Sequence, residues 1–205
     1  MKTLIKNARL VIKDNETDIF DILIEDGKIA KIEKNLDEKI DKVYDAKERL
    51  TLPGGVDVHV HLREPGFENK ETIRTGTMAA LRGGYTSLMP MPNLKPNPDS
   101  LENIEKYMAI IDKDALVNVF PTACITEKSQ GRKVVDMKAI KDRFGINAFT
   151  DDGVGVQDEK IMLEAMEKAK KQDGIIVAHT EDMSYRKPNS SVHDGAFAKE
   201  NGWIG

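Results

Sequence analysis

The sequence predicts an α/β protein with a parallel β-sheet. After Pro53, β-rich segments alternate with segments whose apolar residues recur at helical spacing. This alternation is typical of parallel strands joined by right-handed crossover helices. No G-x-G-x-x-G loop follows the first of these strands, which disfavours a dinucleotide-binding sheet. A polar residue follows nearly every predicted strand, and this favours a (β/α)8 barrel over an open sheet, because those ends carry the active site of such barrels.

The first 52 residues are predicted to form a small sheet. The predicted strands are residues 4–5, 10–12, 19–24 and 28–32. Asp26 and Gly27 separate the last two and predict a hairpin, because a type I′ turn needs positive φ at both central residues. The charged residues 34–42 are predicted to be a loop. This segment has too few apolar residues for an independent domain, so we expect it to pack against another part of the protein.

The remainder of the chain is predicted to contain five strands and four helices. The predicted strands are residues 55–60, 85–89, 115–120, 145–149 and 174–178. The predicted helices are residues 69–82, 101–111, 134–143 and 157–171. Gly83 and Gly84 are expected to end the first helix, and Asp99 or Ser100 to cap the start of the second.

Composition excludes several classes of protein. The chain has 205 residues, of which 40% are hydrophobic, enough for a folded core rather than a disordered tail. A net charge of −4 gives no general attraction to nucleic acid or anionic lipid, and no apolar run approaches the roughly 20 residues that span a bilayer. Cys124 is the single cysteine and has no internal disulfide partner, which favours a cytoplasmic location. Cys124 is expected to be a buried structural thiol.

Three of the four histidines fall at the ends of predicted strands. His59 and His61 are two residues apart, so both side chains point to the same face. Imidazoles at that spacing are able to chelate one divalent ion, although two polar residues at a strand end give the same pattern by chance. His179 follows the fifth predicted strand at the same register. His193 lies in a polar stretch and is expected at the surface.

Two neighbouring carboxylates follow the fourth predicted strand. Asp151 and Asp152 fit an Asp-Asp-Gly turn, which is common. They fit equally well an alternative in which one carboxylate bridges two metal ions, with the histidine pair on one ion and His179 on the other. Two ions at bridging distance activate water and polarise a carbonyl. Spacing alone does not choose between these interpretations.

Two further polar residues indicate the charge of a substrate. Arg63 follows the histidine pair by two residues. A guanidinium beside dications is repelled unless an anion lies between them, so Arg63 favours a carboxylate-bearing substrate; the alternative is a surface arginine paired with Glu64 or Glu68. Asn93 ends the second strand, where its amide could donate to the same carboxylate or stabilise a turn.

Three sequence runs resemble the amidohydrolase superfamily and, within it, the dihydroorotases. They are PGGVDVHVHLREPG at residues 53–66, MPMPN at residues 89–93 and FTDDGVGV at residues 149–156. The first run is highly specific for this group. The third is characteristic of the branch that bridges its metal ions with aspartate. Other branches and the hydantoinases use a carboxylated lysine, and no lysine stands at that strand end here.

The resemblance implies a (β/α)8 TIM-type barrel with a site for two zinc ions. The implied zinc ligands are His59, His61, Asp151 and His179. The implied substrate-binding residues are His61, Arg63 and Asn93. Position within the motif favours Asp151 over Asp152 as the bridge. The implied reaction is the reversible cyclisation of N-carbamoyl-L-aspartate to L-dihydroorotate in pyrimidine (UMP) biosynthesis.

The length of the chain departs from the family pattern. Residues 1–52 would form the N-terminal part of a small β-sandwich, and residues 53–205 only about the first five βα units of a barrel of roughly 250 residues. The family's proton-shuttling aspartate would lie beyond Gly205. We therefore expect an N-terminal half of a dihydroorotase that is poorly active or inactive alone, with an exposed sheet edge.

Two other functions compete with this prediction. One is another cyclic-amide hydrolase, such as a hydantoinase or an allantoinase. This alternative is disfavoured by Arg63, Asn93 and the aspartate pair. The other is a non-catalytic, dihydroorotase-like scaffold for aspartate transcarbamoylase, although such chains usually lose zinc ligands. A homodimer is a further possible assembly. No nucleic-acid or membrane partner is expected.

Overall fold

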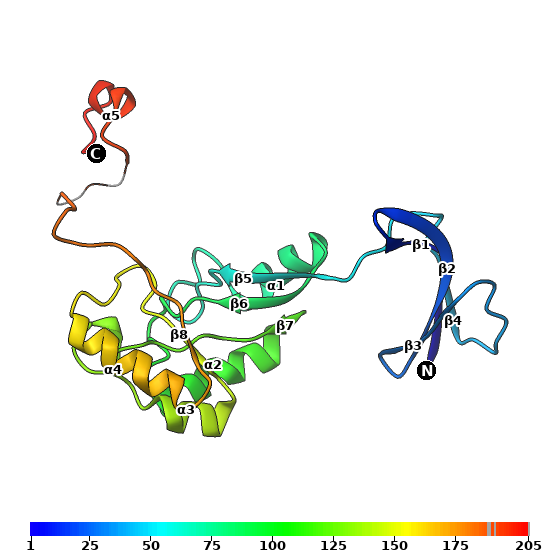
Figure 1. The fold of residues 1–205 in the computed structure, drawn as a ribbon, viewed down its shortest axis with the longest axis horizontal. Coiled ribbons are helices and arrows are strands. Elements are labelled where there is room, and N and C mark those ends of the chain that lie inside the picture. Colours follow the sequence, from blue (N-terminus) through cyan, green and yellow to red (C-terminus); the bar gives the residue numbers. More distant parts are fainter. Residues whose placement is uncertain (188–189, 191, 205) are drawn as a thin grey trace. The chain divides into compact units, whose positions relative to one another are not determined.

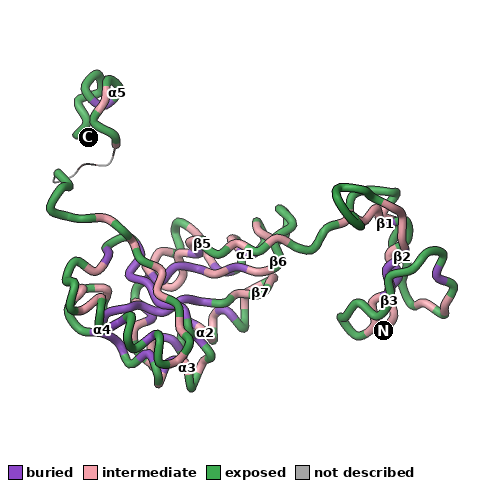
Figure 2. The backbone as a smooth tube through the Cα atoms, in the orientation of Figure 1, coloured by how far each residue is buried: buried purple, intermediate pink, exposed green. Residues whose placement is uncertain are grey.

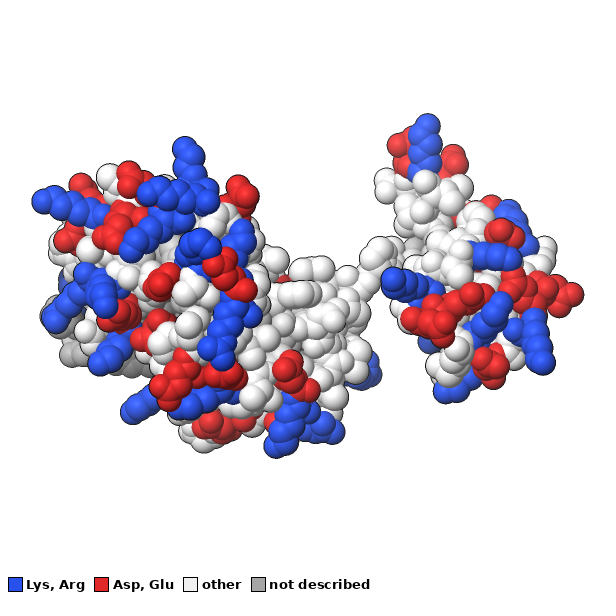
Figure 3. All heavy atoms as spheres, turned by 90° about the horizontal axis from the view of Figure 1, so that it is seen from below, with Lys and Arg blue, Asp and Glu red and all other residues white. Residues whose placement is uncertain are grey.

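The structure is a computed structural model that describes residues 1–187, 190 and 192–204. The chain divides into two compact units, Met1–Gly54 and Gly55–Gly205. None of the helices in the described ranges is long and apolar enough to cross a membrane. Figure 3 shows acidic and basic side chains intermingled on the viewed face of each unit, in keeping with the small net charge of −4.

The first unit is a single four-stranded sheet in the order β3-β2-β1-β4 (Figure 1). Its strands are β1 (Lys2–Lys13), β2 (Glu16–Glu25), β3 (Lys28–Glu33) and β4 (Lys42–Asp45). The β2–β3 hairpin is confirmed, with φ of 48° at Asp26 and 80° at Gly27. Strand β4 pairs in parallel with β1. It was not predicted, because the charged residues around it obscure the sequence pattern expected of a strand.

The predicted strand pair at residues 4–5 and 10–12 is wrong. Both segments belong to the one strand β1, which a bulge interrupts between Ile5 and Ala8. Asn7 has φ of 55° there, and its N–H donates to the buried Asp21 carboxylate at 3.0 Å. The polar residues that break the apolar pattern therefore mark an irregularity within one strand, not a turn between two.

The second unit contains the five predicted parallel strands, of which the last three are shorter than predicted. They are β5 (Gly55–Val60), β6 (Tyr85–Pro90), β7 (Asn118–Val119), β8 (Ala148–Phe149) and β9 (Ile175–Ile176). Strands β5-β6-β7 form one sheet and β8-β9 a second, and an isolated parallel bridge between Ala123 and Phe149 links the segment after β7 to β8. Strand β7 begins later than predicted, because Ala115 caps helix α2 and Leu116 donates its N–H to Thr77 Oγ1 at 3.1 Å.

Four helices follow the strands in alternation, as predicted (Figure 1). They are α1 (Ile73–Arg82), α2 (Leu101–Asp114), α3 (Met137–Phe144) and α4 (Glu159–Lys170). The 3₁₀ turn η1 (Glu127–Ser129) and helix α5 (Ala196–Glu200) were not predicted. Three helices begin two to four residues later than predicted, each after an N-cap side chain that accepts a backbone N–H. Those caps are Thr72, Asp136 and Asp158.

Two hydrophobic clusters hold the strands against the helices, and Figure 2 shows buried segments running through the strand region of this unit. Phe149 on β8 is fully buried in the larger cluster beside Ile140 and Ala165. The second cluster joins Leu62 and Leu88 to Tyr107 of α2. The loops at the ends of β5, β6 and β8 therefore rest on packed side chains.

Replacing Tyr107 by phenylalanine is expected to stabilise the protein by about 1 kcal/mol. The Tyr107 hydroxyl is buried and has no hydrogen-bond partner among the described residues, and this burial raises its pKa. A buried polar group without a partner costs roughly 1–3 kcal/mol, and phenylalanine removes it without changing the ring. The midpoint of urea unfolding, compared between the two proteins, measures the effect; a lower midpoint for Tyr107→Phe would show that the hydroxyl is satisfied.

Candidate metal centre

Histidine and aspartate side chains from three separate strand ends meet in the second unit. His59 lies on β5 and His61 directly after it, Asp152 follows β8, and His179 follows β9. The strands are parallel, so their carboxyl ends share one edge and bring together residues far apart in the sequence.

The three imidazoles converge on the carboxylate of Asp152. His59 Nε2 lies 3.6 Å and His179 Nδ1 3.5 Å from Asp152 Oδ1, and His61 Nε2 lies 3.7 Å from Asp152 Oδ2. Potential ligand atoms of His59, His61 and Asp152 all lie within 4.8 Å of one another. Both oxygens of one carboxylate thus face imidazole nitrogens.

The structure corrects the choice between the two aspartates. Asp151, which we expected to bridge, faces away from the imidazoles, and its Oδ1 accepts the N–H groups of Ile125 at 2.9 Å and Thr126 at 3.2 Å. Its Oδ2 accepts the Thr126 hydroxyl. Burial raises the pKa of Asp151, and the hydrogen bonds from Thr126 and Ile125 oppose that rise. Consecutive residues at a strand end point to opposite faces, so Asp152 takes the position beside the histidines.

The surroundings of two imidazoles fit the binding of a metal ion. His61 Nδ1 lies 3.0 Å from Asn93 Oδ1, an acceptor, so Nδ1 carries the proton and Nε2 presents its lone pair towards Asp152. His179 Nε2 lies 3.3 Å from Glu181 Oε2, which leaves Nδ1 free to act as a ligand. A second hydrogen bond of this kind is typical of metal-binding histidines. Glu181 was not predicted, because nothing in its local sequence pattern separates it from other charged loop residues.

A cavity of about 290 Å³ lies beside this cluster. It is lined by Arg63, Phe67, Lys70, Asn93, Asp152, Gly153 and Val154. Arg63 reaches it although the chain does not stay extended there: Arg63 has φ of 62°. Asn93 faces His61 with its oxygen and, through Nδ2, lies 3.4 Å from Asp152 Oδ2. A cavity with Arg63 and an adjacent lysine attracts an anion.

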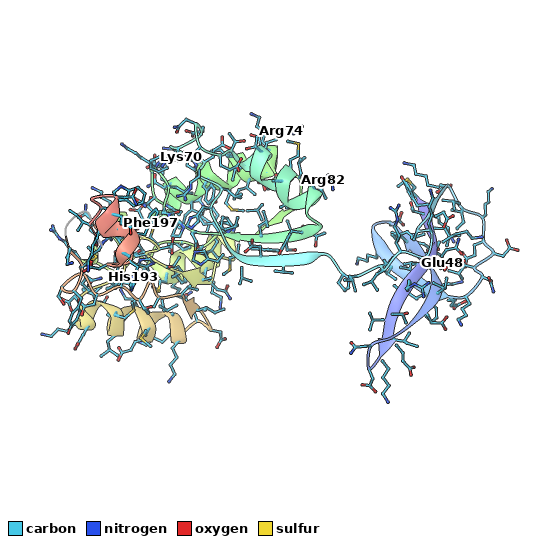
Figure 4. The ribbon with its side chains drawn as sticks, turned by 90° about the horizontal axis from the view of Figure 1, so that it is seen from above. Glu48, Lys70, Arg74, Arg82, His193 and Phe197 are labelled. Carbon is cyan, nitrogen blue, oxygen red and sulfur yellow. The ribbon has the colours of Figure 1, made fainter. Side chains whose placement is uncertain are left out.

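Other features of the second unit lie outside this cluster. Another cavity, of about 620 Å³, is lined mainly by residues of α3, of the loop before it and of the end of α4, and no histidine lines it. Cys124 is fully buried, as predicted, and burial raises the pKa of its thiol. His193 is exposed on the segment before α5, where Figure 4 labels it with Phe197.

A family model described as dihydro-orotase-like matches residues 48–204 of the chain. The chain belongs to this dihydroorotase-like family. Among curated relatives, it is 48% identical to the dihydroorotase of Halalkalibacterium halodurans and 45% identical to that of Bacillus cytotoxicus. Each match covers all of this chain but only 47% of the relative, so the chain spans about half the length of these family members.

The fold matches solved structures of hydantoinases and dihydropyrimidinases. The L-hydantoinase (dihydropyrimidinase) of Arthrobacter aurescens superposes with a TM-score of 0.77 at 23% identity, over 88% of this chain and 41% of the hydantoinase. At that identity the match shows the fold alone. The chain therefore shares its α/β fold with the corresponding part of this hydantoinase.

Proposed function

We propose that this chain supplies the metal-binding part of a dihydroorotase, which interconverts N-carbamoyl-L-aspartate and L-dihydroorotate. The convergence of three imidazoles on Asp152 at 3.5–3.7 Å carries the proposal. Membership of the dihydroorotase-like family supports the choice of reaction. The hydantoinase and allantoinase alternatives are weaker, because this strand end carries aspartates and no lysine.

The proposed cofactor is a pair of zinc ions. His59 and His61 would hold the first ion, His179 the second, and Asp152 would bridge them in place of Asp151. Neutral imidazole and carboxylate are suitable zinc donors. Bound zinc supplies Lewis acidity towards the ring amide carbonyl and lowers the pKa of water.

The protein's own side chains would bind and orient the substrate. Arg63 would hold the substrate carboxylate in the cavity beside Asp152. Asn93 keeps the tautomer of His61 fixed, and the second hydrogen of its amide remains able to donate to the same carboxylate. Binding at this end fixes the position of the ring relative to the histidines, which is how positioning contributes to rate.

The surroundings of the site are also part of the proposal. Five parallel strands with site residues at their carboxyl ends support a partial (β/α) barrel. The sheet of residues 1–52 would belong to a small β-sandwich. A cytoplasmic location rests on the single cysteine. A homodimer or a complex with aspartate transcarbamoylase rests on the family resemblance.

The direct test is turnover in the zinc-loaded enzyme that joins this chain to the remaining half found in its relatives, because the chain alone covers only 47% of their length. Ring opening of L-dihydroorotate is expected to be lost on treatment with a chelator and restored by zinc. Hydantoin and allantoin, offered in parallel, are expected to react more slowly. Faster turnover of either competitor, or full activity without metal, would contradict the proposal.

Replacing Arg63 by methionine is expected to raise KM for L-dihydroorotate by about 10–100-fold in the active enzyme. A charge-assisted hydrogen bond is worth about 1.5–3 kcal/mol, and each 1.4 kcal/mol is roughly tenfold in affinity. Arg74→Met is the matched control, because Arg74 is exposed on α1 (Figure 4) and does not line the cavity. Steady-state kinetics of both variants measure the effect. An equal KM in both would remove Arg63 from substrate binding.

A further inference from the structure

One side chain joins the loop that carries Asp152 to the segment that follows His179. Gln157 lies just before Asp158, the N-cap of α4. Its Nε2 donates to the main-chain oxygen of Glu181 at 2.8 Å, and its Oε1 accepts the N–H of Met183 at 3.1 Å. The amide thus pairs with the backbone of residues 181–183 as a neighbouring strand would.

A close backbone approach lies beside this pair of hydrogen bonds. Gly155 has φ of 69°, and a Cβ atom placed on it would lie only 2.7 Å from the main-chain oxygen of His179. Gly155 also donates its N–H to the main-chain oxygen of Asp151 at 2.8 Å. The main chain around the aspartates is therefore in direct contact with that of His179.

The segment fixed by Gln157 also orients the His179 imidazole. Glu181, whose main-chain oxygen accepts from Gln157, places its carboxylate 3.3 Å from His179 Nε2. Arg186 holds the other side of that carboxylate, with Nη1 3.3 Å from Glu181 Oε1. A shift of Glu181 would therefore turn the imidazole away from Asp152.

We infer that Gln157 is a positioning residue, which sets the distance and orientation of His179 relative to Asp152. The link to zinc rests on the proposed function, whereas the link to His179 does not. Gln157 is exposed, so its replacement leaves the hydrophobic clusters intact. A change at the imidazole is then separable from loss of the fold.

The test compares Gln157→Ala and Gln157→Glu with Gln130→Ala as the matched control. Gln130 is also exposed in a loop, and its side chain makes no hydrogen bond to another described residue. Gln157→Glu keeps the acceptor for Met183 but places an oxygen against the Glu181 carbonyl. Zinc titration against a competing chelator is expected to show about tenfold weaker binding in both Gln157 variants, as for other residues that orient metal ligands.

Two readouts in metal-free protein complete the test. Hydrogen exchange at the Met183 amide is expected to speed up in Gln157→Ala, and the ring resonances of His179 are expected to shift, with the urea midpoint unchanged. Unchanged His179 resonances, or zinc affinity equal to that of Gln130→Ala, would overturn the inference. A native chain that takes up no zinc, but whose His179 resonances respond to Gln157, would contradict the proposed function and support the positioning role.

Discussion

Replacing Asp152 by alanine is expected to weaken zinc binding by at least about 100-fold and to leave the metal-free protein almost as stable as before. Its carboxylate is the common neighbour of three imidazoles. Loss of a residue that only orients a ligand costs roughly 10–100-fold, so loss of the proposed bridging ligand should cost more. Its contacts to protein atoms are long, at 3.4–3.7 Å, so little hydrogen bonding is lost from the fold.

The same substitution one residue earlier is expected to have the opposite effect. Asp151→Ala leaves the N–H groups of Ile125 and Thr126 buried without their acceptor. Each such donor costs roughly 1–3 kcal/mol, so we expect a loss of about 2–5 kcal/mol in the free energy of unfolding. Zinc affinity of the molecules that remain folded should change by less than about tenfold.

Calorimetric zinc titration and urea unfolding of both variants distinguish the two roles. Each variant serves as the control for the other, because both remove the same group from adjacent positions. If Asp151→Ala abolished zinc binding while its unfolding midpoint stayed at the value of the native chain, the assignment of the bridge to Asp152 would be wrong.

The contrast between these two residues shows what local sequence is able to predict. The Asp-Asp pair at a strand end indicates a carboxylate near the histidines, because parallel strands place their carboxyl ends together. Which carboxylate faces the histidines depends on the path of the chain after Phe149, where the predicted strand 145–149 and β8 (Ala148–Phe149) both end. A difference of a residue at that point exchanges the two sides. The partners of Asp151 come from a loop about 25 residues earlier.

The second group of contacts that sequence reasoning missed is also long-range. His59, His61 and His179 were recognisable because they follow apolar strands at similar register. Glu181 and Gln157 act on His179 only through the path of two loops, which has no local periodicity.

The helices were predicted well where an N-cap residue precedes an apolar repeat, as at Ser100 before α2, and less well where the cap lies inside a polar run.

Gly66→Ala is expected to destabilise the protein by about 3–5 kcal/mol and to disrupt the cavity beside Asp152. Gly66 has φ of 99°, and a Cβ atom there would lie 2.3 Å from the main-chain oxygen of Lys95 and 2.9 Å from its Cα. Positive φ costs an L-residue roughly 1–2 kcal/mol, and forced overpacking a further 1–3 kcal/mol. The obstruction is backbone, so a change of rotamer cannot relieve it.

The position of Gly66 links this loss of stability to the site. Pro65, next to it, accepts the N–H of Lys95 at 3.0 Å, so the loops after β5 and β6 pack directly on each other. These loops carry Arg63 and Asn93, which line the same cavity. Separating them should weaken substrate binding in whatever fraction of the protein remains folded.

Gly84→Ala separates the cost of positive φ from the cost of the collision. Gly84 has φ of 83°, but nothing lies within 4 Å of a Cβ atom placed on it. We therefore expect Gly84→Ala to lose only about 1–2 kcal/mol in urea unfolding, the cost of backbone strain alone. The difference between the two variants measures how tightly the two loops press together. Equal losses would mean that the loop after β5 is free to move away from Lys95, so that packing at Gly66 does not hold Arg63 and Asn93 together.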